Sequence, residues 1–225
     1  MKAMILAAGR GERMRPLTDQ LPKPLLNAAG KPLIQYHIES LVRAGYRELV
    51  INHAWLGDKL TAYLGDGQRF AAQIRYSDEG TEGLETAGGI RQALPLLGNE
   101  PFLVVNGDIW TDLDFSSLHL PADKLAHLVL VPNPPQHPQG DFGLQQDGLA
   151  LQQAATQYTF SGIALYRPAF FQQVPAGKQK LAPFLRSAMA QGLVSAELYQ
   201  GQWFDIGTVE RLTQLSDLLE KRHVG

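Results

Sequence analysis

The sequence of 225 residues contains no cysteine, which excludes disulfides, thiolate-ligated zinc and cysteine nucleophiles. It also lacks long apolar runs, since stretches such as 4–8 and 125–131 fall far below the roughly 20 residues of a membrane-spanning helix. Charge of one sign is not in surplus, because 20 Lys and Arg residues oppose 22 Asp and Glu residues. We therefore expect no membrane span and no nucleic-acid partner and, without an apolar leader segment, a cytoplasmic protein.

The residues that are present predict one domain over 1–225, since a hydrophobic content of 44% at this length supports one substantial core. Apolar runs at 1–8 and 102–106 predict strands buried on both faces. Further strands are predicted at 48–52, 74–76, 125–131 and 159–166, and helices at 32–45, 58–64 capped by Asp58, 86–94 ending before Pro95, 181–190, and 209–219 capped by Thr208. Strands alternating with helices predict an α/β fold: an open, mostly parallel, Rossmann-like sheet with helices on both faces. Ligands of such a sheet bind beyond the carboxyl ends of the strands.

A loop rich in glycine and arginine follows the first predicted strand. It reads Gly9-Arg10-Gly11-Glu12-Arg13-Met14-Arg15, and its position at the carboxyl edge of the sheet is one where phosphates bind. Met14 stands where a dinucleotide motif needs its third glycine, and no Lys-Ser or Lys-Thr follows as in a P-loop. Two glycines alone are equally typical of an ordinary turn, so the loop by itself does not indicate a function.

The residues after this loop make the pattern specific. With Pro16-Leu17-Thr18 and then Pro22-Lys23-Pro24, the chain resembles the sugar-1-phosphate nucleotidyltransferases. The resemblance implies that the catalytic residues are Lys23 and Arg15. It implies that the nucleotide is bound by Ala7, Ala8, Gly9, Gly11, Glu12, Arg13 and Lys23. Two prolines stiffen the backbone around Lys23, which suits an ammonium group that must be aimed at a transferring phosphoryl group.

Two carboxylates match the same family. Asp108 ends a predicted strand in Asn106-Gly107-Asp108, and Asp205 lies in Trp203-Phe204-Asp205-Ile206-Gly207-Thr208. The resemblance implies that both hold Mg²⁺, which prefers hard oxygen ligands. The pair Asp112-Leu113-Asp114 supports an alternative, a metal-dependent glycosyltransferase, although Asp114 also fits a helix cap before 115–118. No metal-ligand spacing is found among His37, His53, His119, His127, His137 and His223.

The nucleobase and sugar sites are implied by weaker matches. The segment Leu84-Glu85-Thr86-Ala87-Gly88-Gly89 falls where the family borders the nucleobase, which implies contacts from Glu85, Ala87 and Gly88. Glu85 replaces the usual glycine, and in this the chain most resembles the N-acetylmuramate-1-phosphate uridylyltransferases. The resemblance further implies a small sugar-binding subdomain in the second half, with the sugar beside Asn106, Gly143 and Gly162. Gln152-Gln153-Ala154-Ala155 stands in place of the family's Glu-Lys-Pro, so the family's second phosphate-contacting lysine is missing here. Lys178 or Lys180 either replaces it or is an exposed loop residue.

The implied reaction is Mg²⁺-dependent transfer of a uridylyl group from UTP to a sugar 1-phosphate, giving a UDP-sugar and pyrophosphate. The subgroup implies N-acetylmuramate 1-phosphate as acceptor, in cell-wall sugar recycling, with Arg91 or Lys178 as a cation for its lactyl carboxylate by position only. The attacking phosphate oxygen is already anionic, so catalysis requires positioning and charge neutralisation rather than a general base. Alternatives are another pair such as glucose or mannose 1-phosphate with its nucleotide, the glycosyltransferase, and a nucleotide-binding regulatory subunit.

Overall fold

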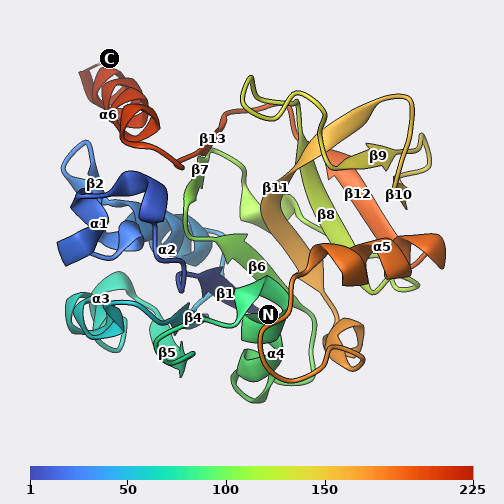
Figure 1. The fold of residues 1–225 in the computed structure, drawn as a ribbon, viewed down its shortest axis with the longest axis horizontal. Coiled ribbons are helices and arrows are strands. Elements are labelled where there is room, and N and C mark those ends of the chain that lie inside the picture. Colours follow the sequence, from blue (N-terminus) through green and yellow to red (C-terminus); the bar gives the residue numbers. More distant parts are fainter. Residues whose placement is uncertain (225) are drawn as a thin grey trace.

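The unbroken apolar strand β1 (Lys2–Leu6) lies inside the sheet, between two parallel neighbours (Figure 1). These are β4 (Glu48–His53) and β6 (Phe102–Asn106), and β4 also pairs in parallel with β5 (Gln73–Asp78). This computed structural model describes the backbone of residues 1–224 and the side chains of residues 1–222. In the first half of the chain the predicted parallel sheet is confirmed.

The second half extends the same sheet in a mixed pattern. Strand β11 (Gln157–Tyr166) runs antiparallel to β6 and to β8 (Ala126–Val131), and β12 (Val194–Leu198) runs parallel to β8. The short strands β9 (Phe142–Leu144) and β10 (Ala150–Leu151) continue from β11 at one edge. Two small separate ladders join β2 (Asn27–Ala28) to β3 (Lys31–Pro32) and β7 (Ile109–Thr111) to β13 (Trp203–Asp205).

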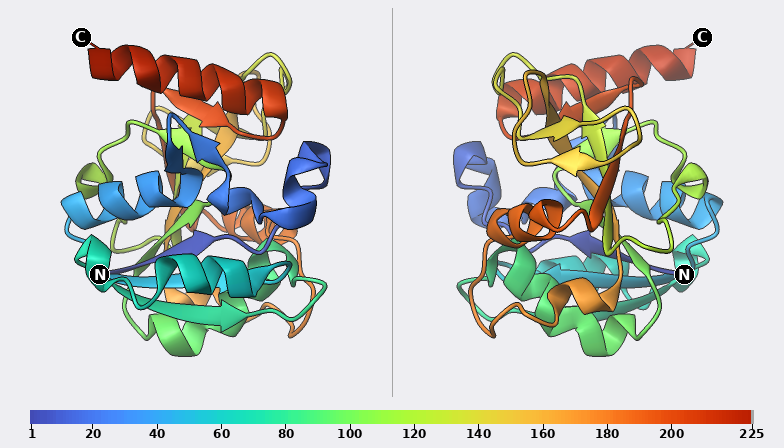
Figure 2. Two further views of the ribbon diagram at one scale, coloured as in Figure 1. Left: turned by 90° about the vertical axis from the view of Figure 1, so that its left-hand side faces the viewer. Right: turned by 90° about the vertical axis from the view of Figure 1, so that its right-hand side faces the viewer.

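Helices cover both faces of the sheet, as alternation along β1 requires. Ile5 packs into one apolar cluster with Ile38 of α2 (Leu33–Arg43), and Met4 packs into another with Ile90 of α4 (Glu85–Leu97). The remaining helices are α1 (Leu17–Gln20), α3 (Gly57–Leu64), α5 (Ala182–Ala190) and α6 (Val209–Val224), with 3₁₀ turns at Glu12–Met14, Lys23–Leu25, Gln68–Phe70, Phe115–Ser117 and Pro168–Phe171. Helix α6 (red in Figure 2) lies at one end of the molecule and packs on a third cluster around Met14 and Trp110. In the described part of the chain, no helix is both long and apolar enough to cross a membrane.

Three predicted helix boundaries are wrong. Helix α3 begins after Leu56, which adopts the left-handed region with φ 54°, so Asp58 lies in the first turn and is not the cap. Helix α4 continues through Pro95, which costs little because the proline lies in the last turn, and the N–H of Gly98 still bonds to Leu94 O at 2.9 Å. Helix α6 continues past its predicted end because Arg222 in its last turns bonds to groups on other elements.

Candidate active site

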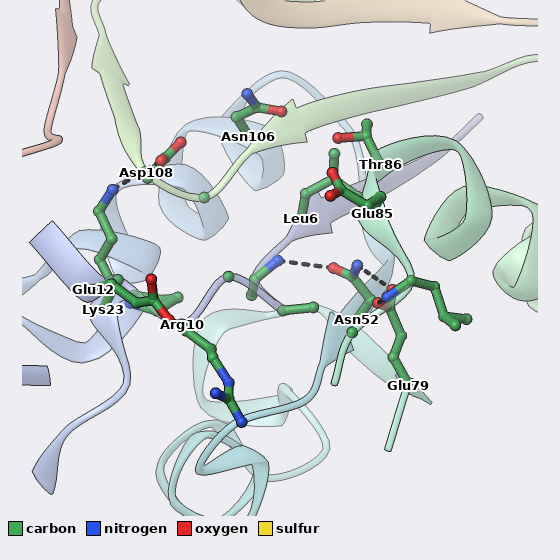
Figure 3. Close-up of a pocket in the computed structure, with 18 of the residues that line it drawn as sticks. Leu6, Arg10, Glu12, Lys23, Asn52, Glu79, Glu85, Thr86, Asn106 and Asp108 are labelled. Atoms are coloured by element: carbon green, nitrogen blue, oxygen red, sulfur yellow. Dashed lines mark hydrogen bonds and ion pairs between the residues drawn. The ribbon is translucent and has the colours of Figure 1, made fainter. Parts of the chain in front are cut away.

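A cavity of about 500 Å³ opens at the carboxyl ends of β1, β4, β5 and β6 (Figure 3). This is the edge of the sheet where the strand order predicts a ligand site. The predicted site residues that line it are Ala7, Ala8, Gly9, Gly11, Glu12, Arg13, Lys23, Glu85, Asn106 and Asp108. Residues from four separate segments of the sequence, 7–13, 23, 85 and 106–108, are therefore brought to one surface.

The glycine-rich loop forms one wall of the cavity. Gly11 adopts the left-handed region with φ 66°, and its carbonyl accepts a hydrogen bond from the Thr18 hydroxyl at 2.8 Å, which fixes the turn. The guanidinium of Arg10 lies over the ring of Trp55, 5.5 Å from its centroid, and Arg13 lies against Gly207. The loop therefore places backbone and two cations at the cavity, a combination that suits a polyphosphate.

Lys23 and Asp108 form the charged centre of the cavity. The Lys23 Nζ lies 2.8 Å from Asp108 Oδ2, and the lysine, on the 3₁₀ turn after Pro22, is only 7% exposed (Figure 3). Asp108 follows β6 and keeps 40% of its side chain exposed. A nearly buried ammonium at the cavity can act on an anionic ligand, and the carboxylate beside it can hold a metal cation.

The second predicted metal ligand, Asp205, lies next to this centre through its backbone. The N–H of Ile206 donates to Asp108 O at 2.8 Å, and Asp205 pairs with Ile109 across the β13–β7 ladder. Its carboxylate, however, forms an ion pair with Arg211 and does not line the cavity. Among the residues described, no group of three or more His, Cys, Asp or Glu side chains converges on one point. The donor set fits magnesium, which needs only one or two carboxylates and takes its other ligands from water and substrate phosphate.

The segment predicted to border the nucleobase lies opposite the glycine-rich loop. Glu85 is exposed to the cavity and has a left-handed backbone with φ 58°, which explains why glycine is the usual residue there in the family that the chain resembles. Ala87 and Gly88 are buried behind the cavity wall, and both N–H groups donate to Gln179 O, at 3.0 and 3.2 Å. This contact brings in a segment from the second half of the chain that carries Lys178 to the cavity.

Of the three predicted sugar residues, Asn106 alone lines the cavity. Asn106 lines it, and Gly162, with φ 80° at a bulge in β11, lies so close that a Cβ there would be 2.5 Å from Asn106 Nδ2. Gly143 packs against Ala154 and does not line the cavity. The structure therefore groups Asn106 with Gly162 and separates Gly143 from them.

Several predicted residues lie away from the cavity. Arg15 is exposed, and its Nε lies 3.2 Å from Asp19, so its side chain is turned outward. Asp112 accepts hydrogen bonds from the Tyr199 hydroxyl at 2.5 Å and from the Gln202 N–H at 2.8 Å, and it pairs with Arg222. Asp114 accepts from the Ser116 N–H at 3.0 Å, which confirms it as a cap, of a 3₁₀ turn rather than an α-helix. Neither member of the D-x-D pair faces the cavity, nor do Arg91 and Lys180.

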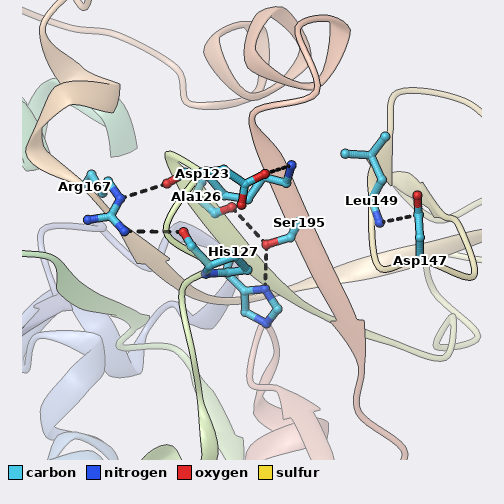
Figure 4. Close-up of polar contacts among 9 residues, drawn as sticks. Asp123, Ala126, His127, Asp147, Leu149, Arg167 and Ser195 are labelled. Carbon is cyan, nitrogen blue, oxygen red and sulfur yellow. Dashed lines mark hydrogen bonds and ion pairs between the residues drawn. The ribbon is translucent and has the colours of Figure 1, made fainter.

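One histidine takes part in an array that resembles a catalytic triad. His127 Nδ1 lies 2.9 Å from Ser195 Oγ, between β8 and β12 (Figure 4). Its Nε2 lies 3.2 Å from Glu197 Oε2. Ser195 is buried and its backbone bridges to Leu149, so no substrate reaches the hydroxyl. The array therefore joins two strands of the sheet. The side chain of His223, also considered above, lies outside the described residues.

Two polar residues of the site were missed by sequence reasoning. Asn52 lies next to the last residue of β4 and Glu79 follows β5, and both line the cavity and are buried. Burial raises the pKa of the Glu79 carboxyl, against the lowering effect of its hydrogen bonds from Asn52 and from the Leu84 N–H. Their positions at the carboxyl ends of parallel strands were the available signal.

Comparison with known proteins identifies the family to which this chain belongs. The family model for nucleotidyl transferases matches residues 2–222. An N-acetylmuramate alpha-1-phosphate uridylyltransferase of Neisseria meningitidis serogroup B is 54% identical over 226 residues, covering 97% of this chain and 98% of the relative. A protein of the same name from Caulobacter vibrioides is 33% identical over 91% of each chain.

A solved structure of a UDP-glucose pyrophosphorylase complexed with UDP-glucose has the same fold, with a TM-score of 0.81 at 21% identity over 98% of both chains. The family match spans almost the whole chain. In the structure of this chain, the glycine-rich loop, Lys23 and Asp108 meet at one cavity. We conclude that this chain belongs to the nucleotidyl transferase family.

Proposed function

We propose that the chain transfers a uridylyl group from UTP to N-acetylmuramate 1-phosphate, giving the UDP-sugar and pyrophosphate. The observation that carries the reaction type is the Lys23–Asp108 pair, 2.8 Å apart inside a cavity walled by the glycine-rich loop. The choice of base and sugar is supported by the relative that is 54% identical over nearly the full length of both chains. We further propose a role in cell-wall sugar recycling and a cytoplasmic site.

The cavity residues divide the chemistry between them. An oxygen of the sugar phosphate attacks the α-phosphorus of UTP, a new P–O bond forms, and the bond to the β-phosphate breaks to release pyrophosphate. The attacking oxygen is already anionic, so no proton has to be removed. Lys23 would stabilise the negative charge that develops at the α-phosphate, and the backbone of 9–13 with Arg13 would receive the leaving pyrophosphate.

Magnesium would be held by Asp108, with Asp205 as the adjacent second carboxylate. When bound, the ion neutralises charge on the triphosphate. In the present arrangement Lys23 pairs with Asp108 and Arg211 pairs with Asp205, so each carboxylate has a cationic partner. We include Asp108 in the catalytic set with Lys23, and we leave out Arg15, whose side chain pairs with Asp19 away from the cavity.

The sugar is expected beside Asn106, which lines the cavity and is backed by Gly162. The lactyl carboxylate of N-acetylmuramate needs a cation or water, and Lys178 is the cavity lysine that forms no ion pair within residues 1–222. A cation in that place would favour the muramate sugar over analogues that lack the carboxylate.

The test is pyrophosphate release measured with UTP and a panel of sugar 1-phosphates in the presence of Mg²⁺. We expect kcat/KM to be highest with N-acetylmuramate 1-phosphate. Equal or better use of glucose or mannose 1-phosphate would overturn the sugar assignment and leave the reaction type in place. The glycosyltransferase alternative has no support from the structure, because Asp112 and Asp114 are bonded to groups outside the cavity.

A further inference from the structure

A chain of hydrogen bonds crosses the floor of the cavity and links its two nucleotide-binding walls (Figure 3). The N–H of Ala7, at the start of the glycine-rich loop, donates to Asn52 Oδ1 at 2.8 Å. Asn52 Nδ2 donates to Glu79 Oε1 at 2.6 Å, and the other oxygen of Glu79 accepts from the N–H of Leu84 at 2.6 Å. Leu84 opens the segment that borders the predicted nucleobase site.

The direction of donation along this series of hydrogen bonds is fixed at both ends. The N–H groups of Ala7 and Leu84 belong to the backbone and can only donate. The Asn52 side chain keeps this direction, because its amide oxygen accepts from Ala7 and its amide nitrogen donates to Glu79. Residue 79 must therefore accept on both sides, which an ionised carboxylate does with its two oxygens. A glutamine there would set two donors against each other at one of its contacts.

Because the side chains in this series of hydrogen bonds are buried, solvent water does not replace their partners. Asn52 is 3% exposed and Glu79 is 9% exposed. Gly89 lies so close that a Cβ at that position would be 2.2 Å from Glu79 Oε1. The N–H of Glu79 itself donates to His53 O at 2.9 Å, which ties the residue to the end of β4. The carboxylate is thus held from several sides at the junction of β4, β5 and α4.

We infer that Glu79 is a positioning residue that fixes the nucleobase segment 84–89 relative to the glycine-rich loop, so that UTP spanning both walls is held in one geometry. The inference rests on the proposed function, since it takes UTP as the ligand. Neither wall needs Glu79 to bind its own part of the nucleotide. Glu79 sets the distance and angle between the two walls, and through that geometry it determines where the α-phosphate lies.

The test exchanges the amide and the carboxylate between positions 52 and 79. In Glu79→Gln one contact becomes donor against donor, and in Asn52→Asp two carboxylates face each other across the 2.6 Å contact. In the double variant Asn52→Asp/Glu79→Gln, the new carboxylate at position 52 accepts from Ala7 and from the new amide at position 79. The oxygen of that amide accepts from Leu84, so every bond and the net charge are restored.

We expect each single variant to lower kcat/KM for UTP by about 10- to 100-fold, the range typical of a small misplacement of reacting groups. The double variant should return to within about threefold of the wild type, and KM for the sugar phosphate should change little. Binding of uridine alone and of tripolyphosphate alone, measured by calorimetry, should stay unchanged in Glu79→Gln while binding of UTP weakens. A role limited to fold stability would change the melting temperature without separating UTP from its fragments.

Single variants that bind and use UTP like the wild type would overturn the inference, as would a folded double variant that is no better than the worse single variant. Loss of uridine binding in Glu79→Gln would also overturn it, because Glu79 would then contact the base directly. UTP binding is measured without turnover, so a wild type that binds UTP but releases no pyrophosphate refutes only the proposed function. A wild type that does not bind UTP overturns both.

Discussion

Replacing Lys23 by Met removes the ammonium from the cavity and keeps most of the apolar stem. The lysine is 7% exposed and its Nζ has one acidic partner, Asp108 Oδ2, at 2.8 Å. The substitution therefore deletes a positive charge at the point where the transferring phosphate is proposed to lie. The backbone should keep its course, because Pro22 and Pro24 hold the turn on either side.

Two magnitudes separate catalysis from stability in this variant. A donor aimed at developing negative charge contributes about 3–4 kcal/mol to the transition state, so kcat should fall by about 10²- to 10³-fold. The ion pair with Asp108 contributes much less to folding, because the Asp108 side chain is 40% exposed and solvent screens it. We expect a loss of about 1 kcal/mol or less in unfolding free energy, or about 2–4 °C in melting temperature.

The assay is pyrophosphate release under saturating substrates, with thermal unfolding measured on the same samples. The matched control is Lys31→Met, which breaks a partly exposed pair with Glu39, 2.6 Å apart and outside the cavity. The control should lose similar stability and keep its kcat. A Lys23→Met enzyme within about threefold of wild-type kcat would refute the catalytic role, as would an equal loss of kcat in the control.

Three further predictions concern single side chains. Asp108→Asn should raise the Mg²⁺ concentration needed for half-maximal rate and lower kcat, whereas the cap variant Asp114→Asn should change neither, as a magnesium titration of both would show. Burial lowers the pKa of His37 to about 4, so as pH falls below 6.5 the unfolded state takes up the proton first and stability is lost. Denaturant unfolding should show that about 2 kcal/mol of the wild type's loss between pH 7 and pH 5 is absent in His37→Gln; an unchanged pH dependence would contradict this. Lys178→Ala should raise KM for N-acetylmuramate 1-phosphate while Lys180→Ala, an exposed lysine outside the cavity, should not, and equal effects on KM would remove Lys178 from the site.

The sequence predicted the part of the fold that depends on local patterns. The apolar run ending at Gly9 and the run ending at Asn106 became β1 and β6, because strands buried on both faces must be apolar throughout. The short strands β2, β3, β7, β9, β10, β12 and β13 were missed. They are two to five residues long, and pairing with other segments rather than their own sequence makes them strands.

The site divides in the same way. Motif positions placed Gly11, Lys23 and Asp108 at the cavity, since these residues follow predicted strands or lie in stiff loops. The motifs do not indicate which ion pairs their residues form, so the pairing of Arg15 with Asp19 and of Asp205 with Arg211 could not be predicted. The Asn52–Glu79 contact joins residues 27 apart in sequence and becomes visible only once β4 and β5 are known to be neighbours.

The central claim is tested most directly by identifying both products of one turnover. Wild-type protein is incubated with UTP, N-acetylmuramate 1-phosphate and Mg²⁺, and mass spectrometry of the nucleotide product is combined with quantitation of pyrophosphate. The account predicts the UDP-linked sugar and pyrophosphate in equal amounts, with neither formed when the sugar phosphate is left out. Unreacted UTP, or a nucleotide-sugar-dependent release of a nucleoside diphosphate in place of pyrophosphate, would contradict it.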